Sequence, residues 1–498
     1  MNPLEIPPGV FSTPTTTSMS SRWSDANFVR WISGRMYPVG GWSRLAYADF
    51  ESDVRAIYNW TDNEGTSYVA YLCEGNLYVD IGGALYDISP VDPIVPPEAN
   101  LIAGGYGDNL YSFGTFGTPR PDIDPAKAIP PCYTLSNWGE QLLAMTSVDG
   151  RLLVWDPVAG PTVPAVVVAG APINNRTFVV TPERHVMVFG KGGDRRKFGW
   201  CDQEDINNWN IASLTSKAGE YDVEPAAPIL SACVCNDGVL MFTTLKVYLV
   251  QPIGLPYVYN YSEIADGATP LSTASLVPTA IGVMWPSESN FWIYASGTVQ
   301  PVPCDVWDSM EWSVGRVRFE AASVNISPLS ELWWFYPSPD AVVSDRYVIY
   351  NYVEGWWSLG KLGRSCGVSA SYSTYPIMGA GRSAYQHEYG IGYEGTSDLP
   401  YVESYNLNVA RGARMSTVDQ MIPDVDGDVD QVAISFFLKD DRSRGTERQS
   451  SVKPIRPNGF VDVRETGRDF RVRFQSKIAT ARWTMGQHLL SVVGRGSK

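Results

Sequence analysis

Short apolar runs separated by tight turns recur along most of the chain. Residues 68–72 and 77–81, for example, flank the polar segment Glu74-Gly75-Asn76. Two such runs around a turn of Gly, Asp or Asn are typical of a β-hairpin. Five further hairpins are predicted from the same pattern, pairing 141–146 with 151–155, 185–189 with 198–201, 239–242 with 247–250, 291–294 with 299–302, and 332–336 with 347–352. Long helical periodicity is nearly absent, so the pattern predicts an all-β protein.

The hairpins recur at a roughly constant interval in the second half of this region. The landmarks Gly238, Phe291 and Tyr347 lie 53 and 56 residues apart. A repeat of this length with several strands per unit is typical of the blades of a β-propeller. We therefore predict a propeller over residues 45–405, with six or seven blades and degenerate repeats. A large irregular β-sandwich is the alternative.

Two segments outside the hairpins interrupt this pattern. Residues 89–132 are rich in Pro and Gly, which oppose ladder hydrogen bonding, and are predicted to form a long loop insertion. Loops of this length are usually functional or disordered, so the insertion is either a contact element or a disordered surface loop. Residues 1–44 are predicted to pack on the propeller or on a neighbouring subunit.

The C-terminal part of the chain has a different pattern and a different charge. Strict alternation at 460–464 and 470–474 indicates half-buried antiparallel strands, and residues 406–498 are predicted to form a small separate antiparallel β domain. Residues 439–498 contain fourteen Lys or Arg and six Asp or Glu, a net +8. Because the whole chain is −15, residues 1–438 carry −23.

Composition narrows the classes of function. The chain has 498 residues, of which 44% are hydrophobic and 18% charged, so it can bury a large core and is not generally disordered. Its net charge of −15 makes a general DNA-binding protein a poor fit, because affinity for nucleic acid comes from neutralising phosphates. Seven irregularly spaced cysteines are expected to be reduced, with Cys233 and Cys235 as core residues. Neither a signal peptide nor a membrane segment is expected.

The sequence contains few candidate catalytic or cofactor-binding residues. Nucleophilic catalysis usually needs a His beside Ser or Cys, and the three histidines, His185, His387 and His488, fall in different predicted units. Residues 190–194 (GKGGD) resemble a phosphate loop only superficially and are predicted to form a hairpin turn. We therefore predict no catalytic residues, no cofactor and no enzymatic activity.

One acidic run is a weak candidate for a metal site. Asp424, Asp426, Asp428 and Asp430 supply the carboxylate oxygens that calcium prefers. An EF-hand would have a Glu at the twelfth loop position, which is Ser435 here. The favoured interpretation is an acidic strand edge or a solvated turn at Gly427.

Several segments together resemble the tail nozzle proteins of short-tailed bacteriophages, which are also known as packaged-DNA stabilisation proteins. The first is residues 22–31 (RWSDANFVRW), followed by Gly34-Arg35 and 39–42 (VGGW). The others are the Gly-rich stretch 104–120, 200–202 (WCD) with Trp209, 291–294 (FWIY) through 300–304 (QPVPC), 345–357 (DRYVIYNYVEGWW), and Gly467-Arg468 with Trp483. The resemblance extends from about residue 6 to residue 495.

This resemblance implies a non-enzymatic structural protein of the virion tail, assembled in the bacterial cytoplasm. Members form a homo-hexameric tube below the head-to-tail adaptor protein, built on a β-propeller with a further β domain. The tube retains packaged genomic DNA and conducts it during ejection, and tail fibre or spike and tip proteins attach to it. The alternatives are a tail-associated carbohydrate-binding or carbohydrate-cleaving propeller and a soluble ligand-binding propeller.

The N-terminal signature permits two interpretations. Its apolar members are either core residues with solvated arginines beside them, or a contact with a neighbouring subunit. The apolar members are Trp23, Phe28, Val29, Trp31 and Trp42, and the arginines are Arg22, Arg30 and Arg35.

Overall fold

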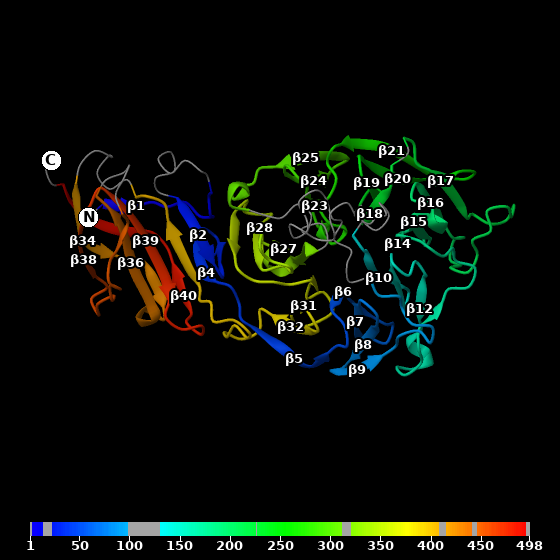
Figure 1. Cartoon of the computed structure of the whole chain (residues 1–498), viewed down its shortest axis with the longest axis horizontal. Helices are drawn as coiled ribbons and strands as arrows, with labels where there is room; N and C mark the ends of the chain where they lie inside the picture. Colours follow the sequence, from blue (N-terminus) through cyan, green and yellow to red (C-terminus); the bar gives the residue numbers. More distant parts are fainter. Residues whose placement is uncertain are drawn as a thin grey trace, which may run out of the picture.

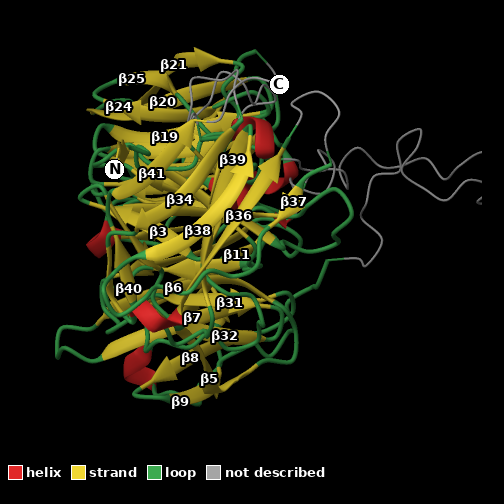
Figure 2. Ribbon diagram, turned by 90° about the vertical axis from the view of Figure 1, so that its left-hand side faces the viewer, coloured by secondary structure: helices red, strands yellow, loops and turns green. Residues whose placement is uncertain are grey.

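The computed structural model describes residues 2–12, 22–97, 130–225, 227–310, 320–407, 415–440 and 446–494. Most of the predicted insertion at 89–132 lies outside these residues. Figures 1 and 2 show an elongated all-β molecule with its many strands gathered into small sheets. Within the described ranges, no helix is long and apolar enough to cross a membrane.

Seven four-stranded antiparallel sheets make up the larger part of the described chain. The first three sheets contain β6 (Val54–Thr61), β7 (Ser67–Cys73), β8 (Leu77–Ile81) and β9 (Ala84–Asp87); β10 (Tyr133–Trp138), β11 (Gln141–Thr146), β12 (Leu153–Trp155) and β13 (Val166–Val167); and β14 (Thr177–Val180), β15 (Val186–Phe189), β16 (Lys197–Trp200) and β17 (Gly219–Asp222). The next three contain β18 (Ile229–Cys235), β19 (Gly238–Thr243), β20 (Lys246–Gly254) and β21 (Val258–Asp266); β22 (Val277–Thr279), β23 (Gly282–Pro286), β24 (Phe291–Ala295) and β25 (Thr298–Val302); and β26 (Ala322–Ile326), β27 (Glu331–Tyr336), β28 (Arg346–Asn351) and β29 (Trp357–Gly360). All six predicted hairpins are confirmed, each as two neighbouring antiparallel strands of one sheet.

The seventh sheet combines two distant parts of the chain. It contains β30 (Cys366–Val368), β31 (Ile377–Ala380), β32 (Ser383–His387) and, as its fourth strand, β5 (Trp42–Asp49). Trp42 pairs with His387, and Ser43 pairs with Gln386. A strand that precedes the first sheet in sequence therefore completes the last one.

Neighbouring sheets pack on one another through their faces. The first strand of each sheet contacts the first strand of the next sheet, from β6 through β10, β14, β18, β22 and β26 to β30, and β30 contacts β6. Side chains between the sheets form separate hydrophobic clusters, and one of them joins the seventh sheet to the first through Cys366, Ile377, Tyr71 and Val54. The core of this region is thus divided among the sheet interfaces.

The remaining strands come from both ends of the chain. They form three sheets, with the orders β1-β41-β34-β38, β2-β33-β39-β36-β37 and β3-β4-β40-β35. Their bounds are β1 (Asn2–Leu4), β2 (Trp23–Asn27), β3 (Val29–Ile32), β4 (Arg35–Pro38), β33 (Tyr401–Ser404), β34 (Ser416–Ile422), β35 (Val425–Gly427), β36 (Val432–Lys439), β37 (Arg448–Gln449), β38 (Val461–Gly467), β39 (Asp469–Ser476), β40 (Trp483–Met485) and β41 (His488–Gly494). We call this part the terminal sheets. The N-terminal strands β1, β2 and β4 thus pair with strands from the C-terminal part of the chain, and β38 and β39 show the predicted alternation of buried and half-buried residues.

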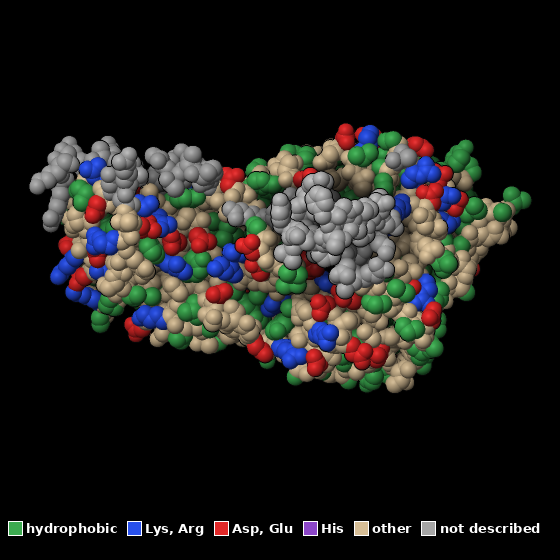
Figure 3. Space-filling model, in the orientation of Figure 1, with side chains coloured by type: hydrophobic (Ala, Val, Ile, Leu, Met, Phe, Trp, Pro, Cys, Tyr) green, Lys and Arg blue, Asp and Glu red, His purple; other side chains and the backbone are tan. Residues whose placement is uncertain are grey.

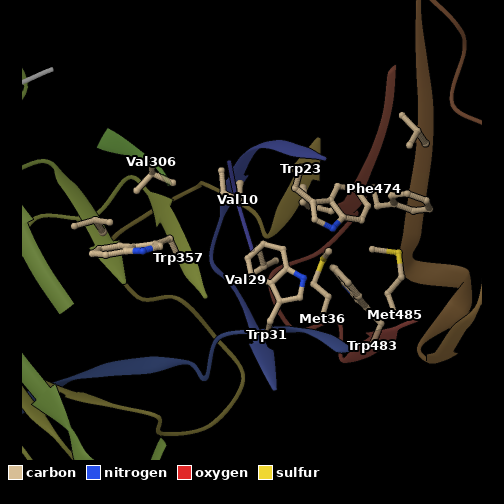
Figure 4. Close-up of a cluster of buried hydrophobic side chains, with 14 of the residues drawn as sticks. Val10, Trp23, Val29, Trp31, Met36, Val306, Trp357, Phe474, Trp483 and Met485 are labelled. Atoms are coloured by element: carbon tan, nitrogen blue, oxygen red, sulfur yellow. The ribbon is translucent and has the colours of Figure 1, made fainter. Parts of the chain in front are cut away.

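One hydrophobic cluster connects the terminal sheets with the fifth and sixth sheets. Figure 4 shows Trp23, Trp31 and Met36 beside Phe474, Trp483 and Met485 of the terminal sheets. The same cluster continues through Val10 and Val29 towards Val306 and Trp357 on the other side. The N-terminal segment therefore contributes side chains to both parts of the molecule.

Candidate functional site

The residues of the N-terminal signature lie at the junction between the terminal sheets and the sixth and seventh sheets. Trp23, Phe28, Val29, Trp31 and Trp42 are all buried within the chain, as the core interpretation requires. Arg35 is exposed, but Arg30 is only 5% exposed, so the expectation that it is a solvated neighbour is wrong. The reason is that two carboxylates from distant segments meet it inside the junction.

Arg30 is the centre of a buried ion cluster. Its guanidinium Nη1 and Nη2 donate to Oε2 and Oε1 of Glu388 at 2.9 and 2.5 Å, and its Nε lies 3.1 Å from Oε1 of Glu331. Arg30 is on β3, Glu331 is the first residue of β27, and Glu388 follows β32. A bidentate pair of this kind fixes orientation as well as charge. The cluster therefore ties a terminal strand to the sixth and seventh sheets.

The charges of the cluster support one another. Burial alone would lower the pKa of Arg30, but attraction to Glu331 and Glu388 raises it above its usual value. Burial raises the pKa of Glu331, and the attraction of Arg30 offsets part of that shift. Glu331 also accepts a hydrogen bond from the indole Nε1 of Trp333 at 3.0 Å. Because a buried charge without a partner is very costly, removing any one member leaves the others destabilised.

A second buried polar pair lies next to this cluster in the chain. Arg364 Nε lies 3.0 Å from Nε2 of His387, the residue before Glu388, and the Arg364 guanidinium stacks over the rings of Tyr385 and Trp42. Burial, followed by the charges of Arg364 and Arg30, lowers the pKa of His387 well below its usual value. Trp42 stacks on His387 with ring centroids 5.2 Å apart. The junction thus holds a continuous buried seam of aromatic and charged side chains.

A cavity of about 490 Å³ opens at the same junction. Tyr37, Tyr393 and Trp483 contribute aromatic side chains to its lining, and Glu388, Asp426 and Arg482 contribute charged ones. Glu388 is already bound to Arg30, whereas Asp426 is exposed. The cavity has the size and mixed lining of a small-ligand site.

The four aspartates of the weak metal candidate do not converge. Asp424, Asp426, Asp428 and Asp430 are all exposed; Asp426 is on β35, the edge strand of its sheet, Asp424 precedes that strand, and Asp428 and Asp430 follow it. Asp428 Oδ2 accepts a hydrogen bond from the Arg482 backbone at 2.9 Å. Among the described residues, no group of three or more His, Cys, Asp or Glu is placed to hold a metal ion. This geometry agrees with the favoured interpretation, an acidic strand edge or a solvated turn at Gly427.

The other candidate residues have local structural roles. His185 Nδ1 lies 2.8 Å from the carbonyl oxygen of Cys201, and His488 Nδ1 accepts from the Asp424 backbone at 3.3 Å. The segment around Lys191 connects β15 to β16, which confirms the predicted hairpin turn. The seven cysteines are free, and Cys233 and Cys235 pack against the cluster between the fourth and fifth sheets.

Sequence reasoning missed the partners of Arg30 and the Arg364–His387 pair. Glu331 and Glu388 lie about three hundred residues or more from Arg30, and nothing in their local sequence marks them as its partners. One local signal was available at Arg30 itself. It stands between Val29 and Trp31 in a short apolar segment, and an arginine there has to find a partner if the strand is buried on both faces.

Comparisons with known proteins identify no family. No protein-family model and no curated protein matches this chain. The chain is similar to a copper-bound fungal alcohol oxidase of the AA5 family, at 13% identity and a TM-score of 0.41, over 90% of this chain and 99% of that one. It is also similar to the extracellular domain of a hybrid two-component system from B. thetaiotaomicron, at 9% identity and a TM-score of 0.40, over 88% of this chain and 62% of that one. Because both TM-scores are below 0.5, these likenesses carry no argument about activity.

Proposed function

We propose that the protein is a structural component of a bacteriophage virion, and that six copies form the tail nozzle below the head-to-tail adaptor. In this role it retains packaged DNA and conducts it during ejection. The observation that carries the proposal is the position of the signature residues 22–42. Most of their apolar side chains lie in a buried junction that joins two all-β parts of the chain, so the segment that carries the first part of the resemblance also holds the subunit together.

The proposed fold is a seven-bladed β-propeller joined to the terminal sheets, with β5 completing the last blade. The contact between β30 and β6 and the hydrophobic cluster between the seventh and first sheets both support closure. A closed ring of sheets leaves only short edges exposed, which suits a subunit that has to assemble in a defined way.

Charge is a second line of support. Residues 1–438, which include all seven sheets, carry a net −23. Carboxylates that face a channel repel the phosphates of DNA and prevent it from adhering to the wall. The proposal therefore requires a channel wall in which Asp and Glu outnumber Lys and Arg.

Cryo-electron microscopy of the purified protein tests ring order and channel lining together. The expected result is a ring of six copies, with a mass in light scattering six times that of the 54.9 kDa chain. The protein is also expected in purified phage particles. A stable monomer or trimer that is absent from particles would contradict the proposal, and so would a channel lined mainly by Arg and Lys.

One observation favours the alternative of a carbohydrate-binding propeller, namely the junction cavity. The half-buried Tyr37 offers an aromatic face in its lining, and the exposed Asp426 and Arg482 offer polar contacts beside it. Titration of purified bacterial polysaccharide fragments into the protein tests this alternative. Binding that is lost in Asp426→Ala but kept in Asp419→Ala, an exposed aspartate on β34, would support it.

A further inference from the structure

Two loops of the neighbouring third and fourth sheets each include a long stretch without charged residues. The connection between β16 and β17 includes the uncharged stretch 206–216, and the β20–β21 hairpin is uncharged from 247 to 262. The chain as a whole is 18% charged, so two such stretches in neighbouring sheets are unusual. The β16–β17 connection has eighteen residues, whereas two residues separate β8 from β9 and β24 from β25, and ten separate β12 from β13.

Both loops expose large apolar side chains at their tips. Ile211 is half exposed and Leu214 is fully exposed in the first loop. In the second, Leu255 is 73% and Tyr257 is 67% exposed, with Ile253 beside them. We call residues 206–216 and 251–257 the two tips. Single exposed apolar residues need no explanation, but five gathered on two tips of neighbouring sheets do.

The roots of the two tips are packed together. Trp200, the last residue of β16, and Tyr259, the second residue of β21, have ring centroids 5.1 Å apart. Tyr221 donates from its hydroxyl to the Tyr259 carbonyl oxygen at 3.1 Å, and Tyr261 donates to the Asp222 carbonyl oxygen at 2.9 Å. The tips therefore project from a common, packed base. Figure 1 places the third and fourth sheets at the end of the molecule opposite β34 and β38, and Figure 3 shows hydrophobic side chains at that end.

We propose that the two tips dock on the surface of an uncharged lipid bilayer. Apolar side chains enter the boundary between headgroups and acyl chains, while the Tyr257 hydroxyl stays at headgroup depth, which is the usual place of tyrosine at membranes. The absence of charge from the tips removes the main cost of such insertion. This inference goes beyond the proposed function and does not depend on it.

Shape and charge favour lipid over a protein partner. A stable protein interface buries about 800 Å² on each side with some twenty residues, whereas the tips offer five apolar side chains on two narrow projections. Projections of this kind need no complementary groove in a fluid bilayer. Because the chain carries −15, anionic lipids repel it, so the structure favours neutral, zwitterionic lipids.

Flotation of the full-length protein with phosphatidylcholine vesicles tests the inference. We expect the wild type to float with the vesicles and the double variant Leu255→Ser/Tyr257→Ser to bind at least fivefold more weakly. Leu214→Ser is expected to weaken binding by a smaller factor. Val452→Ser, which changes an exposed valine of the terminal sheets, is the matched control and should bind like the wild type. Adding phosphatidylglycerol should weaken binding at low salt.

Three results would overturn the inference. They are a wild type that stays with the soluble fraction, tip variants that float as well as the wild type, and tip variants that change the oligomer mass while leaving flotation unchanged. The last result would assign the tips to a contact between copies of the chain. Light scattering on the same samples reports ring order independently, so a failure of the proposed nozzle is distinguished from a failure of lipid docking.

Discussion

Arg364 donates a hydrogen bond from Nε to Nε2 of His387 at 3.0 Å, and both side chains are buried. A nitrogen that accepts a hydrogen bond carries no proton, so His387 is neutral in the folded protein. Protonating it would break this bond and place two cations side by side. His185 and His488 are also buried; burial lowers the pKa of both, and that of His488 falls to about 4.

These three histidines predict a loss of stability in mild acid. The unfolded chain takes up protons as the pH falls through about 6.5, whereas the folded chain resists protonation until lower pH. The free energy of unfolding is therefore steady above about pH 6.5 and decreases below it, by up to about 1.4 kcal/mol per pH unit for each histidine. Urea unfolding at pH 7.5, 6.5 and 5.5 measures this slope. The same urea midpoint at all three values would contradict buried, neutral histidines.

His488 allows a single-residue version of this test. Its ring stacks on Phe474 with centroids 4.7 Å apart, and its Nε2 has no hydrogen-bond partner among the described residues. His488→Phe keeps the stacking and loses the bond from the Asp424 backbone, so we expect a cost of about 1 kcal/mol at pH 7.5. Between pH 6.5 and about 4 the variant should lose less stability than the wild type. An acid slope equal to that of the wild type would exclude His488 as a contributor.

Arg30 and Arg35 form a matched pair for testing the junction. Both stand in the N-terminal signature, but Arg30 is buried between Glu331 and Glu388, and Arg35 is exposed. Arg30→Leu leaves the buried Glu331 and the half-buried Glu388 without their cation, and we expect a loss of about 3–5 kcal/mol in the free energy of unfolding. Arg35→Leu should stay within about 0.5 kcal/mol. Equal effects in chemical denaturation would show that the ion cluster does not stabilise the junction.

Local hairpins were the part of the fold that could be predicted from the sequence. The runs 68–72 and 77–81 are adjacent in the chain, so a turn of three residues sets both their pairing and their register. The pairing of β5 with β32 could not be predicted in the same way. Trp42 and His387 are more than three hundred residues apart, and nothing local selects one distant strand over another.

The burial of side chains at the junction was equally hard to predict from local sequence. Alternation at 460–464 predicted a half-buried strand, and Val461 and Val463 are buried there. This prediction succeeds because a burial period of two depends only on the geometry of a single strand. Arg30 belongs to a strand in which Val29, Arg30 and Trp31 are all buried, so alternation gives the wrong answer there. Its burial is explained by its ion pairs with Glu331 of the sixth sheet and with Glu388, which follows the seventh sheet's strand β32.

Gly238 and Gly282 stand at positions where the sheets have no room for a side chain. Gly238 and Gly282 are the first residues of β19 and β23, with φ of +143° and +147°, a conformation that other residues rarely adopt. A Cβ atom at Gly282 would collide with the carbonyl oxygen of Tyr294, and one at Gly238 with that of Val250. We expect Gly282→Ala and Gly238→Ala each to lower the free energy of unfolding by at least about 2 kcal/mol.

Gly75 is the control for this prediction. It lies in the turn between β7 and β8 with open space around its Cα, so Gly75→Ala should change stability by no more than about 0.5 kcal/mol. Thermal unfolding of the three variants beside the wild type measures the difference. The collisions at Gly238 and Gly282 involve backbone carbonyls of the neighbouring strands β20 and β24. An alanine at either position therefore fits only if β20 moves away from β19, or β24 from β23. Similar melting temperatures for all three variants would mean that these sheets shift at little cost, which is incompatible with tightly packed, closely paired strands.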